Sequence, residues 1–166
     1  MKRQAKRLWV LLFCLCLALT MTAAPAAGEE TEAQPVTDAA ALQAALNNES
    51  YGTVKLANDI TTAATLTVSR TVTLDLNGYV LKYENSNGGK GSVIKVESGG
   101  KLTIIDSQPT KEHKFNENQD GLWVLDETNG DKIVKGGIIT GGMGTSVDDY
   151  VLGGGIYIIG AQCTMA

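Results

Sequence analysis

The sequence predicts an all-β fold, a parallel β-helix (solenoid) that begins with a short capping helix. From Thr53 onward, apolar residues occupy every second position of short segments, which is typical of β-strands. Three such segments, Thr53–Leu56, Thr73–Leu76 and Val93–Val96, follow one another at intervals of 20 residues. A hairpin meander does not require a fixed interval, and its two-residue turn signals are missing here, so stacked coils explain the pattern better.

Stacked coils place equivalent residues of successive coils above one another, at the ~4.8 Å spacing of neighbouring strands. Alternation along each strand then sends two positions into the interior and the position between them outward. The expected interior ladders are Val54, Leu74, Ile94 and Leu56, Leu76, Val96, and the expected outward row is Lys55, Asp75, Lys95. Glycine and asparagine separate the strands, as tight corners require.

The first 26 residues have the pattern of a secretory signal peptide. Four basic residues precede an apolar run over residues 8–21, and small residues then lead to a predicted cleavage site after Ala26. The run is shorter than the ~20 residues that span a bilayer, which disfavours a membrane anchor. Cys14 and Cys16 lack the small preceding residues of a lipidation signal. We therefore expect a secreted or cell-surface protein with no membrane segment after cleavage.

Cleavage leaves an acidic chain with a single cysteine. It removes four of the 14 basic residues and none of the 18 acidic ones, so the formal net charge changes from −4 to −8. An acidic surface disfavours nucleic acid and anionic lipid as partners. Because only Cys163 remains, no internal disulfide can form, and stability must come from packing.

The residues after the signal peptide divide into parts with different patterns. Residues 27–36 lack apolar periodicity and are expected to form a disordered leader. Residues 37–48 predict the capping helix, with Thr37 or Asp38 as the N-cap and an apolar face that suits the end of a coil. The other parts are regular coils over 53–105, a loop excursion over 106–135 and incomplete glycine-rich coils over 136–166.

The strand segments and their flanking residues resemble a known family. Residues 42–46, 53–56, 73–78 and 93–106 resemble the N-terminal coils of pectate-lyase-like right-handed parallel β-helix proteins. The glycine-flanked strands GGIITGG (136–142) and GGGIY (153–157) are similar to those of surface β-helix proteins of Gram-positive bacteria. The resemblance implies a right-handed coil and an adhesive role, through contact with a glycan, a host surface or a cell wall. Since the last strand has no polar cap, we expect a truncated reading frame.

The loop excursion over residues 106–135 is where the sequence favours a binding function, because long insertions in solenoids commonly carry it. Trp123 and Phe115, together with Tyr150, are the candidate stacking surfaces for sugar rings. Covering the side of the coil is the other explanation for the first two residues. The excursion also predicts a local hairpin, formed by residues 122–125 and 132–134 across Asn129-Gly130.

The sequence predicts no catalytic machinery in this chain. His113 is the only histidine and has no serine or cysteine partner, so we expect an exposed loop residue rather than a general base. Lyases that the chain resembles stack several carboxylates on outward positions, where Ca²⁺ binds, beside an arginine or lysine base. The expected outward row here holds only one carboxylate, so no cofactor is expected.

Asp148 and Asp149 are the weak alternative for a Ca²⁺ site, since they form the best remaining acidic pair. A solvated loop explains this pair equally well. The alternative to a non-catalytic adhesion segment is the N-terminal part of a polysaccharide lyase or glycoside hydrolase of the pectin-lyase-like fold. In that case the catalytic coils lie in sequence beyond these residues.

Overall fold

The structure is a computed structural model, and it describes residues 32–86, 90–119, 123–147, 150–152 and 154–166. All of these residues belong to one compact unit, Thr31–Ala166. The predicted signal peptide lies outside the described residues, as does the pair Asp148-Asp149. Among the described residues, no helix is long and apolar enough to cross a membrane.

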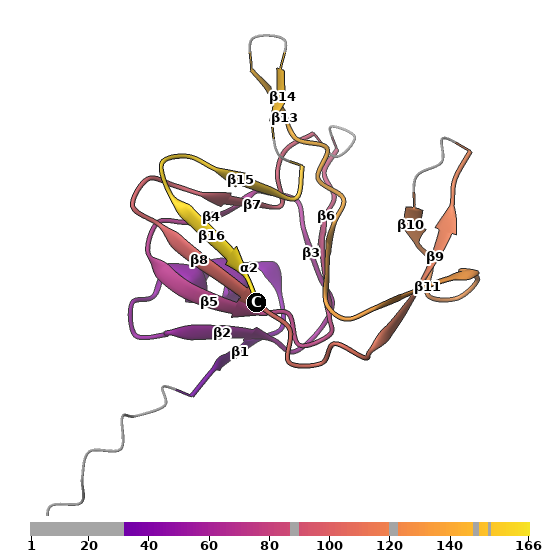
Figure 1. Ribbon diagram of the computed structural model, residues 1–166, viewed down its shortest axis with the longest axis horizontal. Coiled ribbons are helices and arrows are strands. Elements are labelled where there is room, and N and C mark those ends of the chain that lie inside the picture. The colour runs from indigo at the N-terminus through magenta and orange to yellow at the C-terminus, as the bar shows by residue number, and fades with distance from the viewer. Residues whose placement is uncertain (1–31, 87–89, 120–122, 148–149, 153) are drawn as a thin grey trace, which may run out of the picture. The chain divides into compact units, whose positions relative to one another are not determined.

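The described residues are mostly β, with one short helix, and most strands fall into three parallel sheets (Figure 1). Sheet A contains, in spatial order, β1 (Gln34–Val36), β2 (Thr53–Leu56), β5 (Thr71–Asp75), β8 (Lys101–Ile105) and β16 (Gln162–Met165). Sheet B contains β3 (Ile60–Thr62), β6 (Val80–Tyr83) and β12 (Ile138–Thr140). Sheet C contains β4 (Leu66–Val68), β7 (Ile94–Val96) and β15 (Ile156–Ile158).

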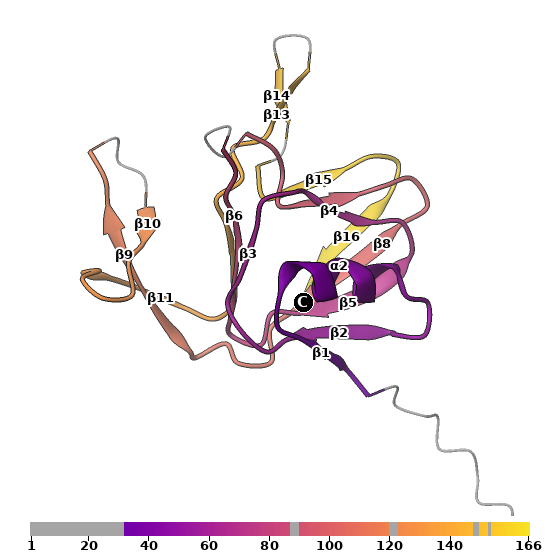
Figure 2. The ribbon, with the colours of Figure 1, turned by 180° about the vertical axis from the view of Figure 1, so that it is seen from behind.

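The chain enters the three sheets in turn. It passes from β2 to β3 and β4, then from β5 to β6 and β7, then from β8 to β12 and β15, and it returns to sheet A in β16. We call each passage through A, B and C a circuit. Neighbouring strands from successive circuits pair in parallel in every sheet. Figure 2 shows the three sheets around a common interior.

The interior is apolar because alternate residues of all three sheets point into it. One core cluster includes Val54 and Leu74 from sheet A, Leu81 from sheet B, and Leu66 and Ile94 from sheet C, each at most 2% exposed. A side chain from one sheet thus packs against side chains from the other two. Burial of these aliphatic side chains contributes roughly 1.5–3 kcal/mol each, and no disulfide is needed to hold the strands.

The helix α2 (Ala39–Asn47) covers the end of the interior at the first circuit (Figure 2), in contact with β1, β2, β3 and β4. Asp38 is its N-cap, and the carboxylate accepts a 2.8 Å hydrogen bond from the backbone N–H of Ala41. At the other end, the guanidinium of Arg70 donates to the carbonyls of Ala45 and Leu46. Both ends of the helix therefore have partners for backbone groups that helix geometry leaves unpaired.

The structure corrects the third copy of the predicted repeat. Val54 pairs with Leu74 as predicted, but Leu74 pairs with Ile104 in β8 rather than with Ile94. Ile94 lies in sheet C, between Leu66 and Ile156. The second circuit is longer than the first, and lengthening a loop costs little free energy, so the 20-residue interval need not persist.

The correction extends to the predicted outward row and to the second interior ladder. Lys95 is not above Asp75, because Lys95 pairs with Thr67 of sheet C. The residue that pairs with Asp75 in β8 is Ile105. Val96 likewise belongs to sheet C, where it pairs with Val68. The alternating-charge row therefore consists of one lysine and one aspartate.

Two insertions project from the third circuit (Figure 1). The first, which we call the arm, is an antiparallel sheet in which β9 (Glu112–Glu117) lies between β10 (Trp123–Leu125) and β11 (Lys132–Lys135). The predicted hairpin between the two outer strands is wrong, because each of them pairs with β9 instead. The second insertion is the hairpin of β13 (Thr145–Val147) and β14 (Tyr150–Leu152).

Candidate functional site

The outward row of sheet A is an ion-paired structural unit. Lys55 Nζ lies 3.4 Å from Asp75 Oδ2 and donates a 2.9 Å hydrogen bond to Ser107 Oγ. The other carboxylate oxygen of Asp75 accepts from the backbone N–H groups of Asn77 and Ser107, at 2.8 and 2.9 Å. Asp75 is 4% exposed. Its carboxylate therefore holds the corner after β5 and has little access to a ligand.

The same contacts keep Asp75 ionised. Burial alone would raise its pKa, but hydrogen bonds from Ser107 and Asn77 and the charge of Lys55 outweigh burial, so the pKa lies below its usual value. A carboxylate engaged in this way is a poor acid or base near neutral pH. Among the described residues, no group of three His, Cys, Asp or Glu side chains is placed to hold a metal ion.

A second carboxylate, that of Asp106, closes the base of the arm. Its Oδ1 accepts from the backbone N–H of Gly78 at 2.6 Å, and its Oδ2 accepts from that of Gly137 at 2.6 Å. These partners lie 28 and 31 residues away in the sequence. One side chain thus joins the corner between β5 and β6 to both ends of the arm. The arm therefore leaves the circuit and rejoins it at nearly the same place.

Glycine is required at both of these positions. Gly78 has φ +69°, and a Cβ there would lie 2.9 Å from atoms of Gln108 and Lys111. A Cβ on Gly137 would overlap the side chain of Leu76. Only a residue without a side chain lets the backbone approach this closely. The sequence alone did not show which side chains pack against these two glycines.

The only histidine is buried, which corrects the expectation of an exposed loop residue. His113 lies in the central strand of the arm, β9, and is 1% exposed. Its Nδ1 lies 2.7 Å from Glu127 Oε1, and its Nε2 lies 2.8 Å from the carbonyl oxygen of Gly78. Because both ring nitrogens are engaged, neither is available as a general base. His113 instead connects the arm to the corner after β5.

Glu127 is the ionised partner of this histidine. Burial alone would raise its pKa. Hydrogen bonds from His113 and from the backbone N–H of Lys114, together with the charges of His113 and Lys111, lower the pKa by more than burial raises it. The net result is a pKa below the usual value. The side chain of Glu127 is 45% exposed, so solvent reaches one side of the pair. Nothing in the sequence indicated that this residue, which lies in a turn, pairs with a histidine 14 residues away.

The three predicted stacking residues lie on three different strands, β9, β10 and β14. Phe115 is 4% exposed, because it lies on the same side of β9 as His113, so its ring is out of reach of a sugar. Trp123 begins β10, opposite Glu117. Tyr150 begins β14, in the separate hairpin. The side chains of Trp123 and Tyr150 are not among the described parts of the structure.

The opposite face of the arm is the one that meets solvent. Val124 is 48% exposed and Ile133 is 58% exposed. They pair with Asn116 and Lys114 of β9, respectively, so all four residues share a face. Two exposed apolar side chains beside an amide and an ammonium group form a mixed surface of the kind found in contact sites.

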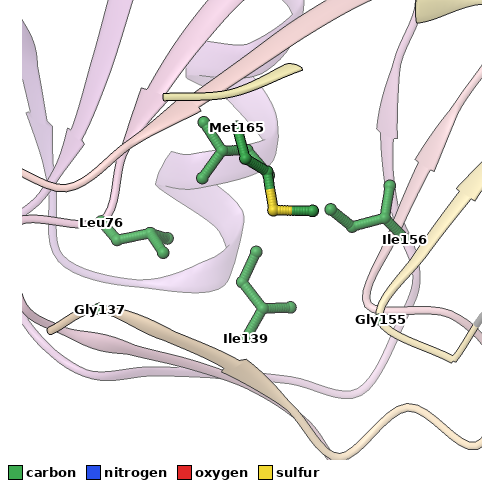
Figure 3. A pocket seen from close by; sticks show the side chains of 7 residues that line it. Leu76, Gly137, Ile139, Gly155, Ile156 and Met165 are labelled. Atoms are coloured by element: carbon green, nitrogen blue, oxygen red, sulfur yellow. The ribbon is translucent and has the colours of Figure 1, made fainter. Parts of the chain in front are cut away.

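An apolar recess lies where the interior is open at the last circuit (Figure 3). Its volume is about 450 Å³, and Leu76, Ile139, Ile156 and Met165 converge on it. None of the residues that line it is titratable, so it offers no group for acid, base or nucleophilic chemistry. Met165 is 78% exposed there, because no further strand covers β16 in the described structure.

Comparison with known proteins gives one match. The model of the pectate lyase-like adhesive domain family matches residues 33–132, which include α2, the first two circuits and most of the arm. No curated protein and no solved structure matches the chain. Because the family model spans more than half of the 166 residues, the chain belongs to the pectate lyase-like adhesive domain family.

Proposed function

We propose that this chain is an extracellular adhesion segment that contacts a glycan, a host surface or a cell wall without transforming it. The observation that carries the proposal is the match to an adhesive domain family over residues 33–132. The predicted signal peptide supports export. The described polar groups support a non-catalytic role, because Asp75, Asp106 and both nitrogens of His113 are engaged in structural hydrogen bonds.

The architecture that we propose for this role is a right-handed parallel β-helix. Two features support it: the chain enters sheets A, B and C in a fixed order, and successive circuits pair in parallel. Crossover connections between parallel strands are right-handed in about 98% of cases. A β-helix offers long, flat outer faces and insertions of variable length, which suit contact with extended polymers.

Within this scaffold, we assign the contact surface to the solvent-facing side of the arm, around Val124 and Ile133. Both are large apolar side chains that are exposed to solvent, and exposed apolar side chains of this kind commonly mark a contact surface. Ile133 lies beside Lys114, whose ammonium group can donate hydrogen bonds to sugar hydroxyls. Trp123, on the neighbouring strand end, remains a candidate stacking residue.

Binding of the whole purified chain to a glycan array and to insoluble cell-wall and host-surface preparations tests the proposal. We expect retention on at least one polysaccharide, and a loss of about tenfold or more in affinity in the variant Val124→Glu/Ile133→Glu, whose two charges face the ligand. The matched control is Thr71→Glu/Thr164→Glu, which adds the same charge at exposed positions of sheet A. No binding by the wild-type chain to any preparation would refute the adhesive function.

The family description also names pectate lyase, so a polysaccharide lyase is the second candidate function. A lyase cleaves a uronic acid polymer by β-elimination, and the unsaturated product absorbs ultraviolet light. Incubation of the whole chain with polygalacturonate and Ca²⁺ therefore separates the two proposals. We expect no unsaturated product, because the outward row of sheet A pairs its carboxylate with Lys55. Product formation that Asp75→Asn abolishes would favour the lyase.

A further inference from the structure

The contacts of His113 impose a requirement on its protonation state. Glu127 presents a carboxylate oxygen to Nδ1, and Gly78 presents a carbonyl oxygen to Nε2. Both partners are acceptors, because Glu127 is ionised and a carbonyl has no proton to give. A neutral imidazole carries one N–H, so it can satisfy only one of the two. The imidazolium form carries two and satisfies both.

The loss of that proton leaves one of the two contacts of the ring without a donor. In a neutral ring, one nitrogen lone pair would face an oxygen at 2.7 or 2.8 Å, at a position that is 1% exposed. A buried ring nitrogen that faces another acceptor costs free energy, and solvent reaches only the Glu127 side of the ring. The unfavourable contact is relieved when either acceptor moves away from the ring. The two acceptors belong to different parts of the molecule. Gly78 belongs to the corner between β5 and β6, and Glu127 belongs to the arm.

We propose that His113, Glu127 and the Gly78 carbonyl form a proton-dependent latch that holds the arm on the outer side of the circuits. Protonated His113 ties the arm to the corner. Of the two contacts, only that of Nε2 with Gly78 joins the arm to the corner, and deprotonation either breaks it or leaves it as an uncharged hydrogen bond. The arm is then held less tightly, while the three parallel sheets keep their own core. The latch goes beyond the adhesive function proposed above and does not depend on the identity of any ligand.

The charged groups around the latch agree with this assignment. Lys111, just before β9, acts on Glu127 and lies 3.4 Å over the ring of Tyr79, so it is tied to the corner of the circuit. Asp106 faces the backbone N–H of Gly78 rather than the histidine. On the arm itself, Glu112 and Lys135 flank the histidine but pair with each other at 3.2 Å. Glu127 is therefore the carboxylate that contacts the ring directly.

The latch has two limits in pH. At its acid limit, Glu127 takes up a proton. Because the pKa of Glu127 is lowered in the folded state, its carboxylate stabilises the latch at pH values above the ordinary pKa of a glutamate, and this stabilisation is lost as the pH falls through the lowered pKa. The upper limit of the latch is the loss of one of the two N–H groups that the contacts of His113 require.

Amide hydrogen exchange of the whole chain at pH 5.5 and 8.5 tests the latch, with rates corrected for intrinsic exchange. We expect protection of β9 and β11 to fall about tenfold or more at the higher pH, because a hydrogen bond to a charged group is lost. Protection of β5, in sheet A, should stay constant and serves as the internal reference. Equal protection of the arm at both pH values would overturn the proposal.

The variant Glu127→Gln separates a proton-dependent latch from ordinary packing. Its amide N–H can donate to Nδ1 of a neutral ring while Nε2 donates to Gly78, so the arm should remain protected at pH 8.5. The matched control is Glu112→Gln, which neutralises a carboxylate of the same arm with 54% of its side chain exposed and should leave the pH response intact. A pH response in Glu127→Gln equal to that of wild type would show that His113 only fills space.

Discussion

Leu74→Ala tests both the interior packing and the register of the sheets. Leu74 is 0% exposed, and strands on both sides hold its neighbours, Val54 and Ile104, in place. The cavity therefore cannot collapse, and we expect a loss of about 3–4 kcal/mol in the free energy of unfolding. For a unit of this size the melting temperature should fall by about 10 °C or more. Urea denaturation followed by circular dichroism measures the change.

The register is tested by double-mutant cycles that combine Leu74→Ala with either Ile104→Ala or Ile94→Ala. Because Leu74 pairs with Ile104, their coupling free energy should be about 0.5 kcal/mol or more and should exceed the coupling with Ile94, which lies in another sheet. Exposed Thr71→Ala is the control and should change stability by at most about 0.5 kcal/mol. A loss below about 1 kcal/mol in Leu74→Ala, or stronger coupling to Ile94, would refute the pairing.

Three further changes test the ends and corners of the structure. Asp38→Ala removes the N-cap of α2 and should cost about 1 kcal/mol in urea denaturation, while Asp38→Asn, which keeps an acceptor, should cost less. Gly137→Ala should lower the free energy of unfolding by about 1–3 kcal/mol, because its Cβ would overlap Leu76. Gly155→Ala, which has open space around its Cβ, is the control. Equal effects of the two changes would contradict the close contact between Gly137 and Leu76. The pKa of Asp75 is lowered in the folded state, so the carboxylate stabilises above its ordinary range of about 3.9 and this contribution is lost as the pH falls through the lowered value. Asp75→Asn should therefore destabilise at pH 7 by about 1–3 kcal/mol and by much less at pH 2, and a uniform loss at both pH values would contradict the assignment.

The sequence did not reveal the strands and buried residues of the arm. The segment Glu112–Glu117 contains mostly polar residues, so it looked like a loop, whereas the structure makes it the central strand of a sheet. Its alternation of His113 and Phe115 with polar neighbours was the available signal. A lone histidine in a polar segment is commonly exposed, and only the approach of Gly78 and Glu127 reveals that this one is buried.

The sequence by itself indicated the regular strands, the capping helix and the family of this protein. It did not indicate β1: residues 27–36 were expected to form a disordered leader, whereas Gln34–Val36 pairs with β2 and buries Val36. Period-two alternation gave the strands and their inward residues, and Asp38 followed by an apolar helical face gave the cap. Only the tertiary structure decided which strand lies above which, so that Leu74 rests on Ile104 and not on Ile94. The physical reason is that alternation specifies which face of a strand is buried, whereas loops of different length close at nearly equal cost. Pairing is therefore decided by how whole circuits fill a shared interior.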